Sequence, residues 1–156
     1  MSNLQIMAPV NGQAISLSEL NDAVFANKIL GDGIAIIPAD GKIVSPVNGK
    51  VATVAVGDHA YGFLTEDDVN VLVHVGLESV NLKGEGFKVL VKAGDAVKVG
   101  DPVAEVDVEF LREKGISLVT PVIVCGEDVQ DRISGIVTGV ATVKAGETAV
   151  ITLDAE

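Results

Sequence analysis

The chain contains two histidines, His59 and His74, and one cysteine, Cys125, and these side chains are its candidates for nucleophilic chemistry. A neutral imidazole is a good nucleophile and proton acceptor near physiological pH. Cys125 ends the apolar run 121–125, with no histidine or basic cluster near it in sequence, which favours a buried and unreactive thiol. The two imidazoles are therefore the predicted chemical centre of the protein.

The segment 69–75 predicts how His74 is presented. Valines occupy alternate positions of this segment, and Asn70, Leu72 and His74 lie between them. Because successive side chains of a strand point to opposite faces, the valines should face the core and His74 the outer face beside Leu72. An imidazole next to an exposed leucine suits a docking surface that excludes water. Taken alone, however, the alternating pattern favours an ordinary surface histidine without a chemical role.

His59 lies 15 residues before His74, a spacing that fits neighbouring strands joined by a turn at the acidic stretch 65–68. If the strands pair, the imidazoles can face each other across the ladder, one as nucleophile and the other as a donor to developing negative charge. Two facing histidines can also bind zinc, which prefers four ligands. A partner protein would then have to complete such a site.

The composition excludes several classes of protein. The chain has 156 residues, 48% of them hydrophobic and 21% charged, which predicts one globular domain spanning residues 1–156. A net charge of −11 disfavours binding to nucleic acid and would attract a basic partner, although acidity also simply aids solubility. The sequence shows neither a membrane-spanning apolar run nor a secretory signal, so we expect a cytoplasmic protein without direct membrane insertion.

Valine, isoleucine and glycine dominate the chain, and aromatic residues make up 3%. Short β-rich runs broken by glycine turns favour an all-β fold, an antiparallel β-sandwich or a barrel-like arrangement. One or two short helical turns are also predicted. The first follows the capping-box spacing of 16–19 and continues toward residues 20–25, and the second begins at Asp107 and ends at Gly115.

Two short segments recur along the chain. Pro-Val-Asn-Gly occurs at 9–12 and again at 46–49, 37 residues later, and Val-Lys-Ala-Gly occurs at 91–94 and 143–146, 52 residues apart. The unequal spacings argue against a regular solenoid. They favour a β motif duplicated within a single domain.

These residues, taken in order, resemble the glucose-type enzyme IIA component of the bacterial phosphoenolpyruvate-dependent sugar phosphotransferase system. The resemblance extends from residue 8 to residue 151. It is carried by the segments 22–26, 31–38, 45–49, 59–60, 71–80, 82–87, 94–101 and 121–124.

The resemblance implies a β-sandwich built on a duplicated hybrid motif, and a phosphotransferase component that acts through a phosphohistidine. His74 would accept a phosphoryl group from the phosphocarrier HPr and pass it to a cysteine on the IIB domain of a membrane sugar permease. His59 would assist the transfer. No cofactor is required, although in some relatives both histidines join a zinc site at a partner interface. Relatives also regulate transporters or metabolic enzymes according to their phosphorylation state.

The resemblance also implies a set of docking and supporting residues around the histidines. These are Leu72, Gly76, Glu78, Gly33, Ile34 and Ile36. Glu78 stands where the family usually has aspartate. Gly57 stands where the family often has a threonine whose hydroxyl orients an active-site imidazole, so orientation must come from elsewhere or transfer is altered.

Three other functions are weighed against this one. The segment 91–103 has the rhythm of a biotin or lipoate carrier, but the hairpin that presents a carrier lysine is missing. A zinc peptidase needs a His-x-His pair, and Gly76 occupies the position two after His74. A purely regulatory binding module is partly compatible with the relay.

Overall fold

The computed structural model describes residues 4–20, 31–55, 57–76, 84–126, 131–136 and 141–154. A large sheet of eight strands has the order β13 (Ala141–Val143), β2 (Gly12–Ser16), β3 (Gly31–Pro38), β11 (Thr120–Cys125), β7 (Asn70–His74), β6 (Ala60–Thr65), β5 (Gly49–Val54), β9 (Ala96–Val97). There are also two sheets of three strands. One has the order β1 (Leu4–Met7), β14 (Ala149–Leu153), β12 (Ile133–Ile136), and the other has the order β4 (Lys42–Val44), β10 (Pro102–Val106), β8 (Phe87–Val89).

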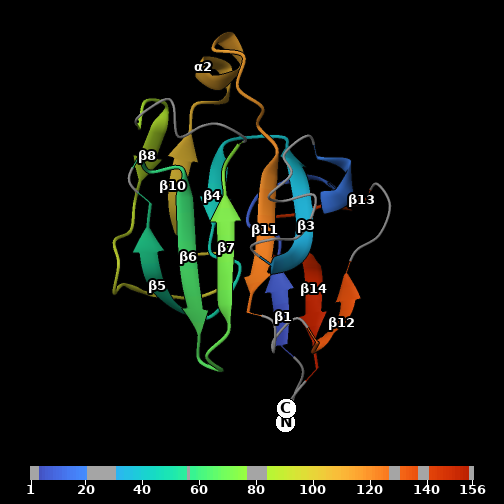
Figure 1. Cartoon of the computed structure of the whole chain (residues 1–156). Coiled ribbons are helices and arrows are strands. Elements are labelled where there is room, and N and C mark those ends of the chain that lie inside the picture. Colours follow the sequence, from blue (N-terminus) through green and yellow to red (C-terminus); the bar gives the residue numbers. More distant parts are fainter. Residues whose placement is uncertain are drawn as a thin grey trace.

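Every strand pair among the described residues is antiparallel, which confirms the predicted all-β sandwich. The large sheet ends at β13 and β9, so the described strands do not close into a barrel. Figure 1 shows β6, β7, β11 and β3 side by side at the centre of the molecule. The strand that carries His74 is thus an interior strand with neighbours on both sides.

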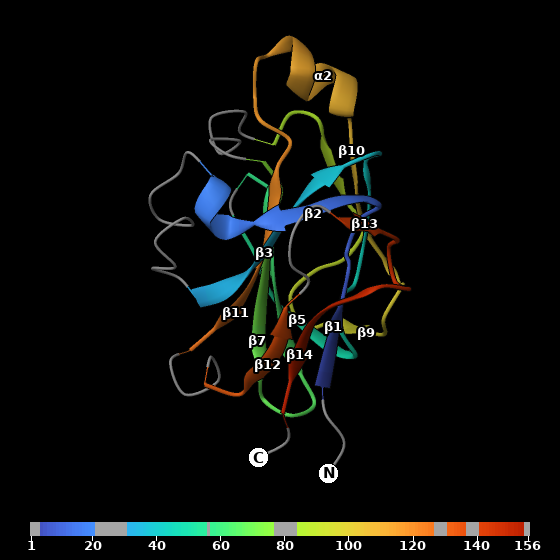
Figure 2. The same cartoon turned by 90° about the vertical axis from the view of Figure 1, so that its right-hand side faces the viewer.

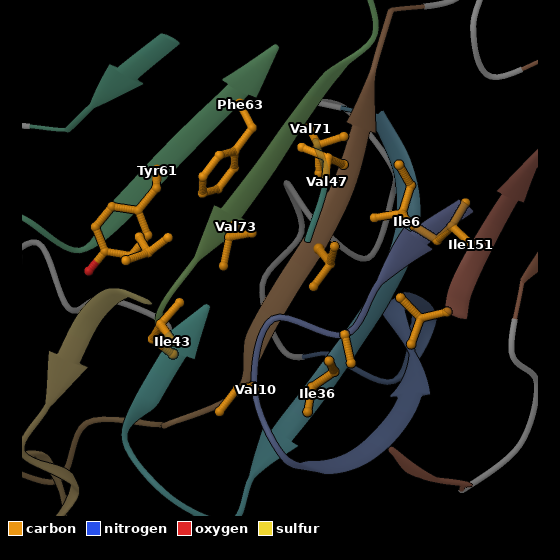
Figure 3. Close-up of a cluster of buried hydrophobic side chains, with 14 of the residues drawn as sticks. Ile6, Val10, Ile36, Ile43, Val47, Tyr61, Phe63, Val71, Val73 and Ile151 are labelled. Atoms are coloured by element: carbon orange, nitrogen blue, oxygen red, sulfur yellow. The ribbon is translucent and has the colours of Figure 1, made fainter. Parts of the chain in front are cut away.

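The core lies on one face of the large sheet. The alternate valines of segment 69–75 are at most 2% exposed, which confirms the predicted core parity. Val73 pairs with Val122 of β11, which in turn pairs with Ile34 of β3, so these three side chains share the buried face. Figure 3 shows Val71, Val73 and Phe63 pointing into this cluster, with Ile36 contributed from β3.

Both predicted helical starts are present. Ser16 caps a single 3-10 turn, η1 (Leu17–Glu19), and the reciprocal bonds of a capping box are formed with Glu19. The predicted continuation over 21–25 lies outside the described residues. Asp107 caps the helix α2 (Val108–Glu113) by accepting from the Phe110 amide, and Gly115 follows it with a φ of 72°. Figure 2 shows α2 at one end of the molecule, away from the sheet faces.

The repeated Pro-Val-Asn-Gly segments occupy equivalent positions in the fold. The Met7 amide donates to the Pro46 carbonyl at 2.9 Å, and reciprocally the Val44 amide donates to the Pro9 carbonyl at 2.8 Å. Each segment's asparagine accepts from a distant turn, Asn11 from the Ala145 amide at 2.8 Å and Asn48 from the Val99 amide at 2.9 Å. These reciprocal bonds support the predicted duplication.

The segment that is structurally equivalent to the turn at 143–146 differs from the one that the sequence repeat predicted. The asparagine contacts relate this turn to segment 97–100, whereas the sequence echo related it to segment 91–94. Gly146 and Gly100 also approach each other closely, because a Cβ built on Gly146 would lie 3.2 Å from the Gly100 Cα. Segments 91–95 and 97–101 have the same turn chemistry, a backbone amide donating to an aspartate three residues on, which explains the misleading echo.

Candidate functional site

His74 is the last residue of β7 and lies on the face opposite the valine row, as the alternation predicted. Its side chain is partly buried, and so is that of Leu72 on the same face. The imidazole is therefore placed where part of it meets solvent while the strand that carries it is fixed by β6 and β11.

A backbone carbonyl sets the tautomer of His74. Nδ1 of His74 lies 2.7 Å from the carbonyl oxygen of Gly76. Because a carbonyl oxygen only accepts, Nδ1 must carry the proton, and the lone pair of the neutral ring is then on Nε2. Gly76 has a φ of 80°, a left-handed conformation that favours glycine, so the sequence after β7 permits this bend. The nucleophilic nitrogen of His74 is thus Nε2.

The two imidazoles are in contact. β6 and β7 form an antiparallel hairpin through the turn at 65–68, as predicted. The ring centroids of His59 and His74 are 4.9 Å apart with an interplanar angle of 78°, an edge-to-face arrangement. The register differs from a direct cross-strand pair, because Ala60 is opposite His74 and His59 precedes the first residue of β6. The predicted meeting of the two rings is confirmed, but it takes place at the end of the hairpin.

His59 is the more buried of the two, with 6% of its surface exposed. Its Nδ1 is buried and has no hydrogen-bond partner among the described residues. Burial lowers the pKa of His59 below the ordinary 6.5, and the Gly57 carbonyl and the Asp58 charge oppose that shift in part. The Gly57 carbonyl is near enough to act electrostatically but does not have hydrogen-bond geometry toward the ring. At neutral pH, His59 is therefore a neutral imidazole.

This pKa shift makes stability depend on pH. On acidification below 6.5, the unfolded chain binds a proton at His59 before the folded chain does, so the free energy of unfolding should decrease. We expect the loss between about pH 7.5 and about pH 5.5 to be smaller in His59→Gln than in the wild type, as measured by urea denaturation. Parallel pH profiles for the two proteins would contradict the assignment.

The resemblance implies a threonine at position 57, and the backbone conformation there accounts for the glycine. Gly57 has a φ of 96°, which L side chains rarely adopt, and a Cβ there would lie 3.3 Å from His59 Nδ1. A threonine at this position would therefore be strained and would crowd the imidazole.

An apolar cluster covers the outer face of the sheet beside His74. It is formed by the buried Leu17, Leu20, Ala35 and Ile123, and the partly buried Leu72 packs against it. A hollow of about 340 Å³ next to Leu72 is also lined by Thr53, Phe63 and Cys125. The face that presents His74 therefore has a recess beside the partly buried Leu72, whose docking role stays a prediction.

The structure corrects the docking prediction for two residues of β3. Ile34 and Ile36 are fully buried, and Ile34 shares the core face with Val73, which is opposite to the face of His74. Their side chains cannot contact a partner that docks at His74. Gly33 does lie on the face of His74, in register with Ile123 and through it with Leu72. The resemblance covers the whole stretch 31–38, whereas the alternating faces of β3 turn Ile34 and Ile36 toward the core.

Other predicted residues have different outcomes. Glu78 and segment 22–26 lie outside the described residues. Cys125 is free and partly buried rather than fully buried, and burial raises the pKa of its thiol, in keeping with low reactivity. The described residues contain no group of three or more His, Cys, Asp or Glu side chains that could hold a metal.

One contact near the site was not predicted from the sequence. The hydroxyl of Tyr61, a buried residue of β6, donates to the Asp58 carbonyl at 2.7 Å. The acceptor of this bond is a backbone carbonyl, which every residue has, so the residue types gave no signal for it.

The protein is an antiparallel β-sandwich. At the end of one of its hairpins, a buried imidazole and a partly exposed imidazole are in contact. The family model for the phosphoenolpyruvate-dependent sugar phosphotransferase system, EIIA 1, matches residues 4–129. The chain belongs to this family and is a phosphotransferase component of sugar uptake.

Curated relatives support the assignment. The glucose-specific EIIA component of Halalkalibacterium halodurans is 44% identical over 149 residues, covering 95% of this chain and 84% of the relative. That of Staphylococcus epidermidis is 40% identical over 149 residues, covering 96% and 89%. The solved glucose permease IIA from Mycoplasma capricolum is similar, with a TM-score of 0.89, 33% identity and coverage of 99% and 97%. Within the described part of the chain, no helix is long and apolar enough to cross a membrane.

Proposed function

We propose that the chain accepts a phosphoryl group from phosphorylated HPr on Nε2 of His74 and transfers it to a cysteine of the IIB domain of a membrane sugar permease. The observation that carries this proposal is the contact between His74 Nδ1 and the Gly76 carbonyl, which places the lone pair on Nε2. An imidazole held in one tautomer is prepared for in-line attack on phosphorus.

Each transfer exchanges one bond to phosphorus for another. In the first, a bond forms between His74 Nε2 and phosphorus while the bond from phosphorus to the HPr histidine breaks and its electron pair stays on the HPr imidazole. In the second, the thiolate of the IIB cysteine attacks, and the electron pair of the broken N–P bond returns to Nε2. No redox step or resident cofactor is needed.

His59 assists by stabilising charge. Its ring is edge-to-face with that of His74, so a group carried on His74 lies close to it. A neutral imidazole can donate one N–H hydrogen bond, and a fixed donor in a partly water-excluded site stabilises the charge on the phosphoryl oxygens. The low pKa of His59 keeps it in this neutral form.

In this proposal the docking surface is supplied by the partly buried Leu72, together with Ile15 and Val119, which pack against the same cluster. Apolar contact would exclude water and protect the phosphohistidine from hydrolysis. Phosphorylation adds roughly −1.5 to −2 charge on this same face, which gives a means of regulating the binding of transporters or enzymes.

A zinc ion at this site would need a partner. His59 and His74 can supply two nitrogen ligands, and the described residues supply no group of three. Zinc prefers four ligands, so we propose that the isolated chain binds zinc weakly and that a partner's ligands complete the site. Calorimetric titration with zinc should show weak binding that His74→Gln removes, and tight binding to the isolated chain would contradict this.

The relay is tested by incubating the protein with phosphoenolpyruvate, enzyme I and HPr. We expect one phosphate per chain, labile in acid and stable in base, as a phosphoramidate requires. Protein that stays unlabelled while HPr is labelled would overturn the proposed function.

A further inference from the structure

Tyr61 is the chain's only tyrosine, and its side chain is fully buried beside Phe63 (Figure 3). Its hydroxyl donates to the Asp58 carbonyl at 2.7 Å. Burial, and secondarily the Asp58 charge, raises the pKa of Tyr61, so the phenol remains a donor at physiological pH. A phenylalanine would fill nearly the same space in the core. The hydroxyl therefore has a role other than filling volume.

The hydrogen bond from Tyr61 to Asp58 joins residues on either side of His59 in the sequence. Its acceptor, Asp58, has a φ of 59°, a left-handed conformation that is uncommon outside glycine, although aspartate adopts it more readily than most residues. The Asp58 amide donates to the Ala55 carbonyl at 2.9 Å, which closes the turn before His59. Tyr61 thus fixes this left-handed residue from the core side.

The backbone is the main support of the His59 ring. The His59 carbonyl accepts from the Val75 amide at 2.7 Å, and Tyr61 holds the preceding carbonyl. By contrast, Nδ1 of the ring has no hydrogen-bond partner among the described residues. The direction of the imidazole against His74 therefore depends on the orientation of the two peptide units on either side of it.

We propose that Tyr61 is a positioning residue for phosphoryl transfer: through the Asp58 carbonyl, its hydroxyl sets the orientation of the His59 ring against His74. This inference rests on the proposed function, in which His59 stabilises the group carried on His74.

The test is Tyr61→Phe, which removes the hydroxyl and keeps the ring. We expect phosphorylation of His74 by HPr to stay within about twofold of wild type, and transfer to the IIB domain to fall roughly tenfold, because a misplaced assisting group weakens stabilisation of the transferring phosphoryl. NMR titration should show the pKa of His59 rising toward its ordinary value as the ring becomes better solvated.

Ser45→Ala is the matched control. Ser45 is fully buried, and its hydroxyl donates to the Val47 carbonyl at the same 2.7 Å, but it lies next to β4 in a different sheet. This variant loses a comparable bond and should leave both transfer rates and the His59 titration unchanged. If Tyr61→Phe behaves like this control, or lowers acceptance and donation equally, Tyr61 has only a structural role and the inference is wrong.

The two proposals fail in different ways. If the relay itself is wrong, wild-type protein is not labelled or His59→Gln donates as fast as wild type. If only the positioning role is wrong, wild type is labelled and His59→Gln donates slowly, while Tyr61→Phe donates at the wild-type rate.

Discussion

Replacing His74 with glutamine should abolish phosphorylation of the protein by phosphoenolpyruvate, enzyme I and HPr. The amide nitrogen of glutamine is not a nucleophile at neutral pH, so no stable bond to phosphorus can form. Because His74 is partly exposed at a strand end, the fold should survive with its free energy of unfolding changed by about 1 kcal/mol or less. Phosphate incorporation, measured by mass spectrometry on samples that are not acidified, should fall to background.

His59→Gln is the control for this result, since it makes the same chemical change on the neighbouring ring. Only the His74 variant should lose incorporation completely. Stoichiometric phosphate on His74→Gln, with the modified residue mapped elsewhere, would remove His74 from the relay.

His59→Gln should still accept a phosphoryl group but should donate it to the IIB domain roughly a hundredfold more slowly, because the flexible glutamine amide keeps N–H donors but does not hold one in the fixed position of the ring. Acceptance is less affected because Nε2 of His74 is defined by the Gly76 carbonyl and not by His59. Rapid-quench measurement of the two half-reactions separates these effects.

Two outcomes would contradict this role of His59. Equal losses in both half-reactions would mean that His59 serves only the shape of the site, because a structural defect affects both partners. Unchanged donation would mean that the contact between the rings, 4.9 Å between centroids, has no part in transfer.

Strand parity was the most reliable guide to the fold. Alternation in segment 69–75 predicted both the valine core and the outer position of His74, because a strand with one buried face leaves little freedom in its side-chain pattern. In β3, Ile34 and Ile36 likewise share one parity, and both face the core. Resemblance identifies a stretch of chain, whereas the face of each side chain depends on sheet register.

The fine geometry of the site could not be predicted from the sequence. Whether His59 meets His74 directly or from the hairpin end depends on a register shift of one residue, which neither spacing nor composition encodes. The tautomer of His74 and the support from Tyr61 depend on carbonyl oxygens of Gly76 and Asp58. Every residue has a carbonyl, so residue type gives no signal for such contacts.

The interlocked halves of the duplicated motif have a consequence for how the chain emerges from the ribosome. β1 pairs only with β14 among the described strands, Leu4 opposite Leu153, and Asn11 caps a turn 134 residues further on. β1 therefore stays unpaired on the nascent chain until β14 has been synthesised. Closing such distant contacts is slow, so an incomplete chain has an open edge available for wrong pairing during that interval.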